Sequence, residues 1–278
     1  MMSDIPESWM STICFIFGMI IGSFLNVCIF RLPQNMSIVR PRSRCCHCGR
    51  MIPWYYNIPI FAWFLLRGKT ACCHKPLPFR YPFVEFLTAL LAVLVYNYVK
   101  SAPIAIFILI CFLIVAFFTD LNHMIIPDEI TLGGFTAGIL CCAFYPELQN
   151  EHTALLGMLK SMQNACLAMG VLFCFLSFAE FFLKREAMGL GDVKLLACIG
   201  AFCGWQACLF AVFFGAILGT CFFGILTCVS CIKHKPRPAM NTLIPFGPFM
   251  VIATLCYLFG GKQIFIDNYL SPITFCLQ

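Results

Sequence analysis

Apolar residues in this chain lie in long continuous blocks, and they do not alternate with polar residues as in exposed strands. Blocks of this kind are typical of helices that cross a membrane, which need about 20 predominantly apolar residues. The pattern therefore predicts eight membrane-spanning helices, of which the fourth and the sixth are short. Their expected ranges are 9–30, 83–99, 103–119, 130–145, 162–182, 193–206, 207–229 and 244–260.

The composition favours a membrane protein over an ordinary soluble domain. Of the 278 residues, 61% are hydrophobic and only 11% are charged, and the mean hydropathy is +0.90. We predict an all-α polytopic membrane protein with about eight transmembrane helices and one long cytoplasmic loop that contains cysteines. Three regions are expected: a first transmembrane helix at 1–30, the loop at 31–82, and a transmembrane core at 83–278.

The basic residues predict which side of the membrane each connection faces. Fifteen of the 18 Lys and Arg residues lie in connections that alternate onto one side, and that side is expected to be cytoplasmic. Both termini then lie outside the cytoplasm. This favours a bacterial inner membrane, with the first helix retained because no basic segment precedes it. Anionic lipid headgroups explain the net charge of +6, and no nucleic acid is required.

Five of the 20 cysteines cluster in the long loop, whereas the others lie in or beside apolar blocks or in the short C-terminal tail. Disulfides are uncommon in a reducing cytoplasm, so clustered thiols there indicate a metal site. One C-x-x-C pair is followed, after about 24 residues, by an adjacent pair. Four thiolates satisfy tetrahedral Zn²⁺. The predicted ligands are Cys45, Cys48, Cys72 and Cys73, with His47 and His74 as alternatives.

Two carboxylates are predicted at the same membrane edge, although they lie 72 residues apart in the sequence. Asp120 ends the third predicted helix in "FFTDLNHMIIPDEIT", and Asp192 begins the sixth in "GLGDVK". Ionisable residues at such positions are costly and are functional candidates. If the two face each other, they can share one proton and activate a water against a peptide carbonyl.

Residues close to Asp192 suggest both a catalytic and a structural role. Gly189 and Gly191 would allow left-handed backbone or the close approach of a substrate strand. The structural alternative is that each Asp caps a helix or pairs with a neighbour such as Lys194. Because two acids are expected at matching depth, and one follows G-x-G, we favour catalysis.

Together these features resemble the bacterial type IV prepilin peptidases, also called leader peptidase/N-methyltransferases. This family belongs to the G-x-G-D class of intramembrane aspartic proteases. The resemblance covers about residues 20–250, and its motifs occur in the family's order. They are "GSFLNVCIFRLP" (22–33), the cysteine-containing loop, "WYYNIPIFAW" (54–63), "FRYPFVE" (79–85), "FTDLNHMIIPD" (118–128) and "GLGDVKLLACIGAF" (189–202).

The resemblance implies an enzyme that acts twice on one substrate. It implies cleavage of the basic leader of type IV prepilins and type II secretion pseudopilins, after a Gly and at the cytoplasmic face. Methylation of the new N-terminal residue from S-adenosylmethionine follows. The family's catalytic pair corresponds to Asp120 and Asp192 here, so 83–278 would be the aspartic peptidase core. Besides membrane lipids, the expected partners are these prepilins and pseudopilins.

Several positions leave more than one role open. The family's loop usually has two C-x-x-C pairs, but Thr70 stands at the third Cys position, and Cys72 would replace it from two residues away. Arg80 and Glu85 either order the loop or approach a cosubstrate. Asn26 either hydrogen-bonds a neighbouring helix or has a functional role. No glycine-rich Rossmann pattern is present, so the sequence does not predict where S-adenosylmethionine binds.

Two other functions stay open at this point. One is an intramembrane aspartic protease with another substrate and no methyltransferase activity. The other is a proton-coupled transporter in which the two acids form a proton relay. A transporter would more naturally place its acids near the membrane midplane, at broken helices of a repeat. Here the acids are predicted at the membrane edge, and the sequence shows no repeat.

Overall fold

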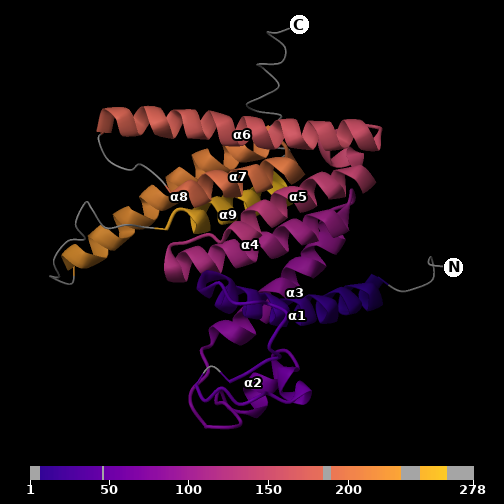
Figure 1. The fold of residues 1–278 in the computed structure, drawn as a ribbon, viewed down its shortest axis with the longest axis vertical. Coiled ribbons are helices and arrows are strands. Elements are labelled where there is room, and N and C mark those ends of the chain that lie inside the picture. Colours follow the sequence, from indigo (N-terminus) through magenta and orange to yellow (C-terminus); the bar gives the residue numbers. More distant parts are fainter. Residues whose placement is uncertain (1–6, 46, 184–188, 233–244, 262–278) are drawn as a thin grey trace, which may run out of the picture. The chain divides into compact units, whose positions relative to one another are not determined.

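The computed structural model describes residues 7–45, 47–183, 189–232 and 245–261, which form helices joined by turns (Figure 1). Within these residues no strand forms, apart from two isolated bridges that pair Arg44 with Met51 and Lys69 with Pro76. The chain divides into two compact units, Met1–Val115 and Ala116–Gln278. The division into a first transmembrane helix, a cysteine-containing loop and a transmembrane core, which the sequence suggested, stays a prediction.

The N-terminal unit is built on two helices, α1 (Glu7–Arg31) and α3 (Arg80–Tyr98), which pack along each other. Gly18 and Gly22 of α1 lie at this contact. A Cβ atom on either would come within 2.6 or 2.7 Å of the α3 backbone, so only glycine permits the close approach. Between the two helices runs the cysteine loop, residues 32–79. It contains the short helices η1 (Leu32–Gln34), η2 (Trp54–Asn57) and α2 (Phe61–Leu65).

The C-terminal unit surrounds a short buried helix, α7 (Leu190–Cys203), which contacts α5, α6 and α8. Ten of its 14 residues are buried. Gly138 of α5 allows this packing, because a Cβ there would lie 2.7 Å from Cβ of Ala201. The α4 helix (Pro103–His123) supplies its last residues to this unit. The remaining elements are α5 (Asp128–Phe144), η3 (Pro146–Gln149), α6 (Ala154–Leu183), α8 (Trp205–Ile232), α9 (Gly247–Cys256) and η4 (Tyr257–Gly261).

All eight predicted apolar segments form helices, and five of these helices are long and apolar enough to cross a membrane. The five are α1, α3, α4, α6 and α8. With 17, 14 and 10 residues, α5, α7 and α9 are shorter. Short helices are tolerated where other protein segments cover them. The chain is therefore an all-α multi-pass membrane protein, as predicted, while the number of eight spans stays a prediction.

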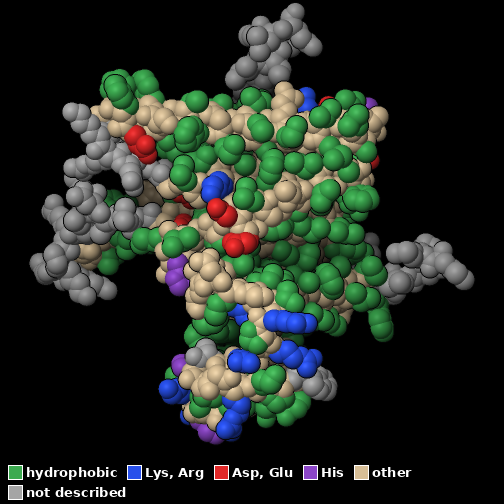
Figure 2. Space-filling model, viewed as in Figure 1, with side chains coloured by type: hydrophobic (Ala, Val, Ile, Leu, Met, Phe, Trp, Pro, Cys, Tyr) green, Lys and Arg blue, Asp and Glu red, His purple; other side chains and the backbone are tan. Residues whose placement is uncertain are grey.

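The surface of the described residues agrees with the distribution of basic and apolar residues in the sequence. Figure 2 shows Lys and Arg side chains over the cysteine loop, and hydrophobic side chains over the long helices. Gly204 alone separates α7 from α8 and has a φ of +82°. Glycine adopts a positive φ without strain, so α7 and α8 are joined by a tight turn. The exposed face of α6 includes Phe173, Phe175, Phe178, Phe181 and Phe182.

Candidate active site and metal centre

Asp120 lies in the last turn of α4, and only 6% of its surface is exposed. Its Oδ2 accepts a hydrogen bond of 2.9 Å from the backbone N–H of Gly247, the first residue of α9. A Cβ on Gly247 would lie 2.7 Å from that same oxygen. Residue 247 must therefore be a glycine for its N–H to reach the carboxylate, and this requirement was missed by the sequence analysis.

Asp192 lies in the first turn of α7 and is 8% exposed. Its Oδ1 is buried and has no hydrogen-bond partner among the described residues. Neither glycine beside it has left-handed backbone, because Gly189 has a φ of −69° and the φ of Gly191 is not positive. A Cβ on Gly191 would come within 3.3 Å of Ile126, and the close approach of a substrate strand to these glycines stays a prediction.

The structure brings the two predicted carboxylates together within the C-terminal unit. The two acids come from different helices, but Ile126 lies close to both: a Cβ on Gly191, beside Asp192, and a Cβ on Gly247, which binds Asp120, would each come within 3.3 Å of its side chain. The alternative pairing with Lys194 is not observed, because Nζ of Lys194 lies 2.6 Å from Oδ1 of Asp128. The N-cap position of α7 is Gly189, and no side chain caps the helix. Neither of the structural roles considered for Asp192 is therefore present.

Two buried carboxylates that interact have a defined chemical capacity. Like charges at close range cannot both ionise easily, so the pair tends to hold one proton. One carboxylate can then remove a proton from water while the other donates a hydrogen bond to a carbonyl oxygen. The arrangement can therefore support hydrolysis of a peptide bond.

Four cysteine thiols converge in the cysteine loop of the N-terminal unit. Their Sγ atoms all lie within 4.8 Å of one another. The Cys45 and Cys73 sulfurs are 3.7 Å apart, and those of Cys48 and Cys72 are 3.3 Å apart. Tetrahedral Zn²⁺ with Zn–S bonds of about 2.3 Å requires sulfurs about 3.8 Å apart. The four predicted ligands therefore fit a zinc ion, and among the described residues His47 and His74 do not belong to the cluster.

Two similar turns present these thiols. In the first turn, Gly49 N–H donates to Cys45 O, and Gly49 has a φ of +69°. In the second, His74 N–H donates to Thr70 O, and His74 has a φ of +54°. Each turn is flanked by one of the two isolated bridges. Thr70 thus occupies the position that matches Cys45, as the sequence alignment of the loop predicted.

Thr70 keeps a role beside the thiols although it carries no sulfur. Its Oγ1 lies 3.1 Å from Sγ of Cys73 and accepts a hydrogen bond of 3.1 Å from Lys75 N–H. The adjacent Cys72 provides the fourth thiol from within the turn. The hydroxyl therefore orients a predicted ligand, as groups around metal ligands commonly do.

Local hydrogen bonds favour thiolate at one position in the cluster. Burial opposes ionisation of Cys45, but the N–H groups of Cys48 and His47 and the neighbouring thiols outweigh it and lower its pKa to about 6. Hydrogen bonds to Cys48 and Cys45 raise the pKa of Cys72 to about 12. The lowered pKa favours thiolate at Cys45, and thiolate is the form in which cysteine binds a metal ion.

Fold and sites define the class of this protein: a multi-pass helical membrane protein with a buried carboxylate pair and a four-cysteine cluster. Comparison with known proteins narrows this class. Residues 16–99 match the model of the bacterial peptidase A24 N-terminal domain, and residues 107–224 match that of the type IV leader peptidase family. No solved structure matches the chain.

Curated relatives agree with these family models. A prepilin leader peptidase/N-methyltransferase of Myxococcus xanthus is 37% identical over 84% of this chain and 68% of its own length. Proteins of the same name from Aeromonas hydrophila and Legionella pneumophila are 33% and 32% identical over 93% and 90% of this chain. The alignments cover 94% and 91% of those two relatives. The chain belongs to the type IV leader peptidase family.

Proposed function

We propose that this protein removes the leader peptide of type IV prepilins and type II secretion pseudopilins, and then methylates the new N-terminal residue. Family membership and the names of the relatives support both activities. The observation that carries the peptidase activity is the buried pair of Asp120 and Asp192 in one unit. Both reactions are placed at the cytoplasmic face of the bacterial inner membrane, in accord with the basic cysteine loop.

Asp120 and Asp192 are the proposed catalytic residues. They hold one proton between them. The ionised carboxylate takes a proton from a water molecule, whose oxygen attacks the scissile carbonyl carbon. The protonated carboxyl group donates its hydrogen bond to the carbonyl oxygen. A proton then passes to the leaving amine as the C–N bond breaks, which leaves the pair with one proton again. The N–H of Gly247 fixes the orientation of Asp120 through this cycle.

The second reaction requires S-adenosylmethionine as the methyl donor and a defined cysteine loop. The sulfonium centre of the donor supplies an electrophilic methyl group to the N-terminal amine of the cleaved product. We assign a structural Zn²⁺ to Cys45, Cys48, Cys72 and Cys73, whose sulfur separations fit the ion. The metal would hold the two turns of the loop together, as structural zinc does in small domains.

Purified protein in lipid nanodiscs, incubated with a purified prepilin, tests this proposal. We expect loss of the leader without any added cofactor, and methylation of the product only when S-adenosylmethionine is added. An intact prepilin after prolonged incubation with well-folded protein would contradict the peptidase proposal. Cleavage without methylation, at saturating donor, would leave a protease of the kind considered from the sequence.

A further inference from the structure

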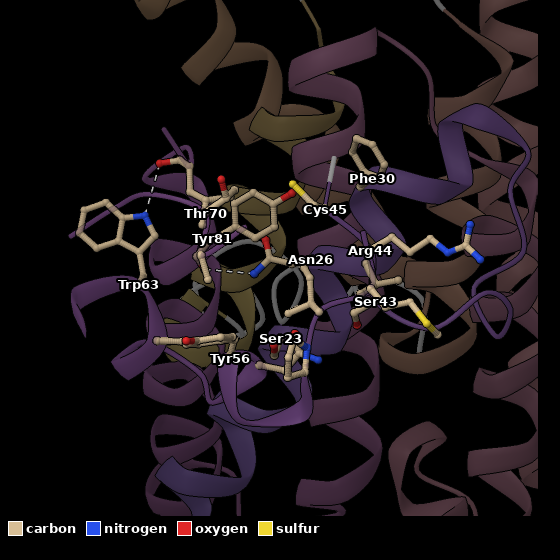
Figure 3. Close-up of a pocket in the computed structure, with 18 of the residues that line it drawn as sticks. Ser23, Asn26, Phe30, Ser43, Arg44, Cys45, Tyr56, Trp63, Thr70 and Tyr81 are labelled. Carbon is tan, nitrogen blue, oxygen red and sulfur yellow. Dashed lines mark hydrogen bonds between the residues drawn. The ribbon is translucent and has the colours of Figure 1, made fainter. Parts of the chain in front are cut away.

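The N-terminal unit contains a cavity of about 750 Å³ that is not lined by Asp120 or Asp192. Its walls come from α1, the cysteine loop and the start of α3, as Figure 3 shows. All residues that line it belong to this unit. The volume lies in the range of about 300–1,000 Å³ that is typical of small-molecule sites. The cavity is therefore large enough for a ligand of nucleoside size.

Asn26 is a buried polar residue in this cavity, and one of its two polar side-chain atoms has no hydrogen-bond partner among the described residues. The residue is 3% exposed, and its Nδ2 donates a hydrogen bond of 3.0 Å to the backbone oxygen of Tyr81 (Figure 3). Its Oδ1 is buried and has no partner among the described residues. An unsatisfied buried acceptor costs about 1–3 kcal/mol. A ligand with an N–H or O–H donor, such as an adenine amine or a ribose hydroxyl, would satisfy it.

Glu85 places a carboxylate in the same cavity. Glu85 is 7% exposed. Among the described residues that line the cavity, it is the one with an acidic side chain. Its Oε2 accepts a hydrogen bond of 2.7 Å from Ile60 N–H. Ile60 has a φ of +61°, which is strained for a β-branched residue, and such strain occurs at ligand-binding segments. Arg31 and Arg44 line the same cavity, so the lining has charges of both signs, and the Glu85 carboxylate is the group that suits a positively charged part of a ligand.

Aromatic rings complete the wall. Tyr56, Trp63 and Tyr81 all line the cavity. The indole N–H of Trp63 donates to Leu77 O at 3.3 Å, and a Cβ on Gly68 would come within 2.9 Å of its ring. The ring is therefore held in place before any ligand binds. Aromatic faces stack on flat heterocycles and attract cations.

We propose that this cavity is the binding site for S-adenosylmethionine. The inference rests on the proposed methyltransferase activity and assigns it a place in the chain. The donor combines a purine ring with hydrogen-bond donors and a positive sulfonium centre, which suit the aromatic wall, Asn26 and Glu85 respectively. Thr70, Cys45 and Cys72 also line the cavity, so metal at the cysteine cluster would stabilise one of its walls.

Binding to the full-length protein in nanodiscs tests this site independently of methylation. We compare S-adenosylmethionine with S-adenosylhomocysteine, which lacks the positive charge, by isothermal titration calorimetry. Glu85→Gln should lower the affinity for S-adenosylmethionine at least about tenfold. It should lower the affinity for S-adenosylhomocysteine by less than about threefold. Asn26→Leu should lower the affinity for both ligands by about tenfold. Glu129→Gln, an exposed acid of the C-terminal unit, is the matched control and should change neither.

Hydrogen exchange on the wild-type protein covers the case in which these variants do not fold. Added S-adenosylmethionine should protect backbone amides in 54–66 and 70–81. If the wild type binds the donor but neither segment is protected, or if Glu85→Gln and Asn26→Leu bind it normally, the site is elsewhere and methylation by this protein still stands. If the wild type binds no donor and yields unmethylated product, the proposed methyltransferase activity fails as well.

Discussion

The two candidate sites of this protein are held in place by different means. In the C-terminal unit, Asp120 and Asp192 project from helices, and the backbone of α9 fixes one of them. In the N-terminal unit, the four thiols project from two turns of an irregular loop. Helix packing keeps the first site in position without a ligand, whereas a cation bound by the four thiols would hold the two turns together. The comparison predicts that cleavage and methylation can be lost separately.

The largest expected effect concerns the carboxylate pair. Asp120→Asn and Asp192→Asn should each lower the cleavage rate by about 10²–10⁴-fold, because an amide cannot take or release the shared proton. Zinc content and donor binding should stay as in the wild type, since both proposed sites lie in the other unit. Leader removal is measured by gel shift of a purified prepilin. Near-normal cleavage by either folded variant would exclude the pair as the catalytic group.

Loss of the metal should affect the other activity. Replacing Cys45 and Cys48 by Ser removes two of four ligands, so bound zinc should fall from about one equivalent to near zero. Methylation should fall below detection, while cleavage should stay within about threefold of the wild type. Metal analysis by plasma mass spectrometry and product mass spectra measure both. Zinc-free wild-type protein that still methylates would contradict this distinction.

A smaller effect is expected from a substitution at Gly247, which lies against the carboxylate of Asp120. Gly247→Ala adds a Cβ that would lie 2.7 Å from Oδ2 of Asp120, so the carboxylate must move. Displacements of this order commonly cost about 10²-fold in rate, and the loss should appear in kcat. Gly224→Ala is the matched control, because nothing lies within 4 Å of its added Cβ. Equal rates for the two variants would show that the contact with Gly247 is unimportant.

The ion pair between Lys194 and Asp128 should matter little, although it is near the catalytic pair in the sequence. Both side chains are more than one third exposed, and exposed ion pairs contribute about 0.2–1 kcal/mol. Lys194→Met should therefore reduce thermal stability slightly and change the cleavage rate by less than about fivefold. A loss above about 100-fold would mean that Lys194 acts on the catalytic carboxylates.

The smallest change is expected from moving a thiol between two positions in one turn. Thr70 occupies the turn position that matches Cys45, and its hydroxyl already contacts Cys73. The single variant Cys72→Ser should lose zinc, whereas Thr70→Cys combined with Cys72→Ser should retain it. Failure of the double variant to bind zinc would show that the two turns are not equivalent.

The sequence predicted those features that depend on local pattern. Each of the eight apolar blocks forms a helix, and the clustered cysteines of the loop indicated the four thiols that lie together. Contacts between distant residues were not predictable: Gly247 and Asp120 are separated by 127 positions, and Lys194 and Asp128 by 66. Such pairs depend on how the helices pack. The cavity was also missed, because residues far apart in the sequence, from α1, the cysteine loop and α3, line it together.

The central claim is that one chain carries two separable sites, and the N-terminus of the processed prepilin tests it most directly. Intact-mass spectrometry of a prepilin incubated with donor and each variant resolves three products: uncleaved, cleaved, and cleaved with one methyl group. We predict uncleaved prepilin with Asp192→Asn, unmethylated cleaved product with Glu85→Gln, and methylated product with the wild type. Cleaved product from Asp192→Asn, or equal loss of cleavage and methylation in Glu85→Gln, would contradict the account.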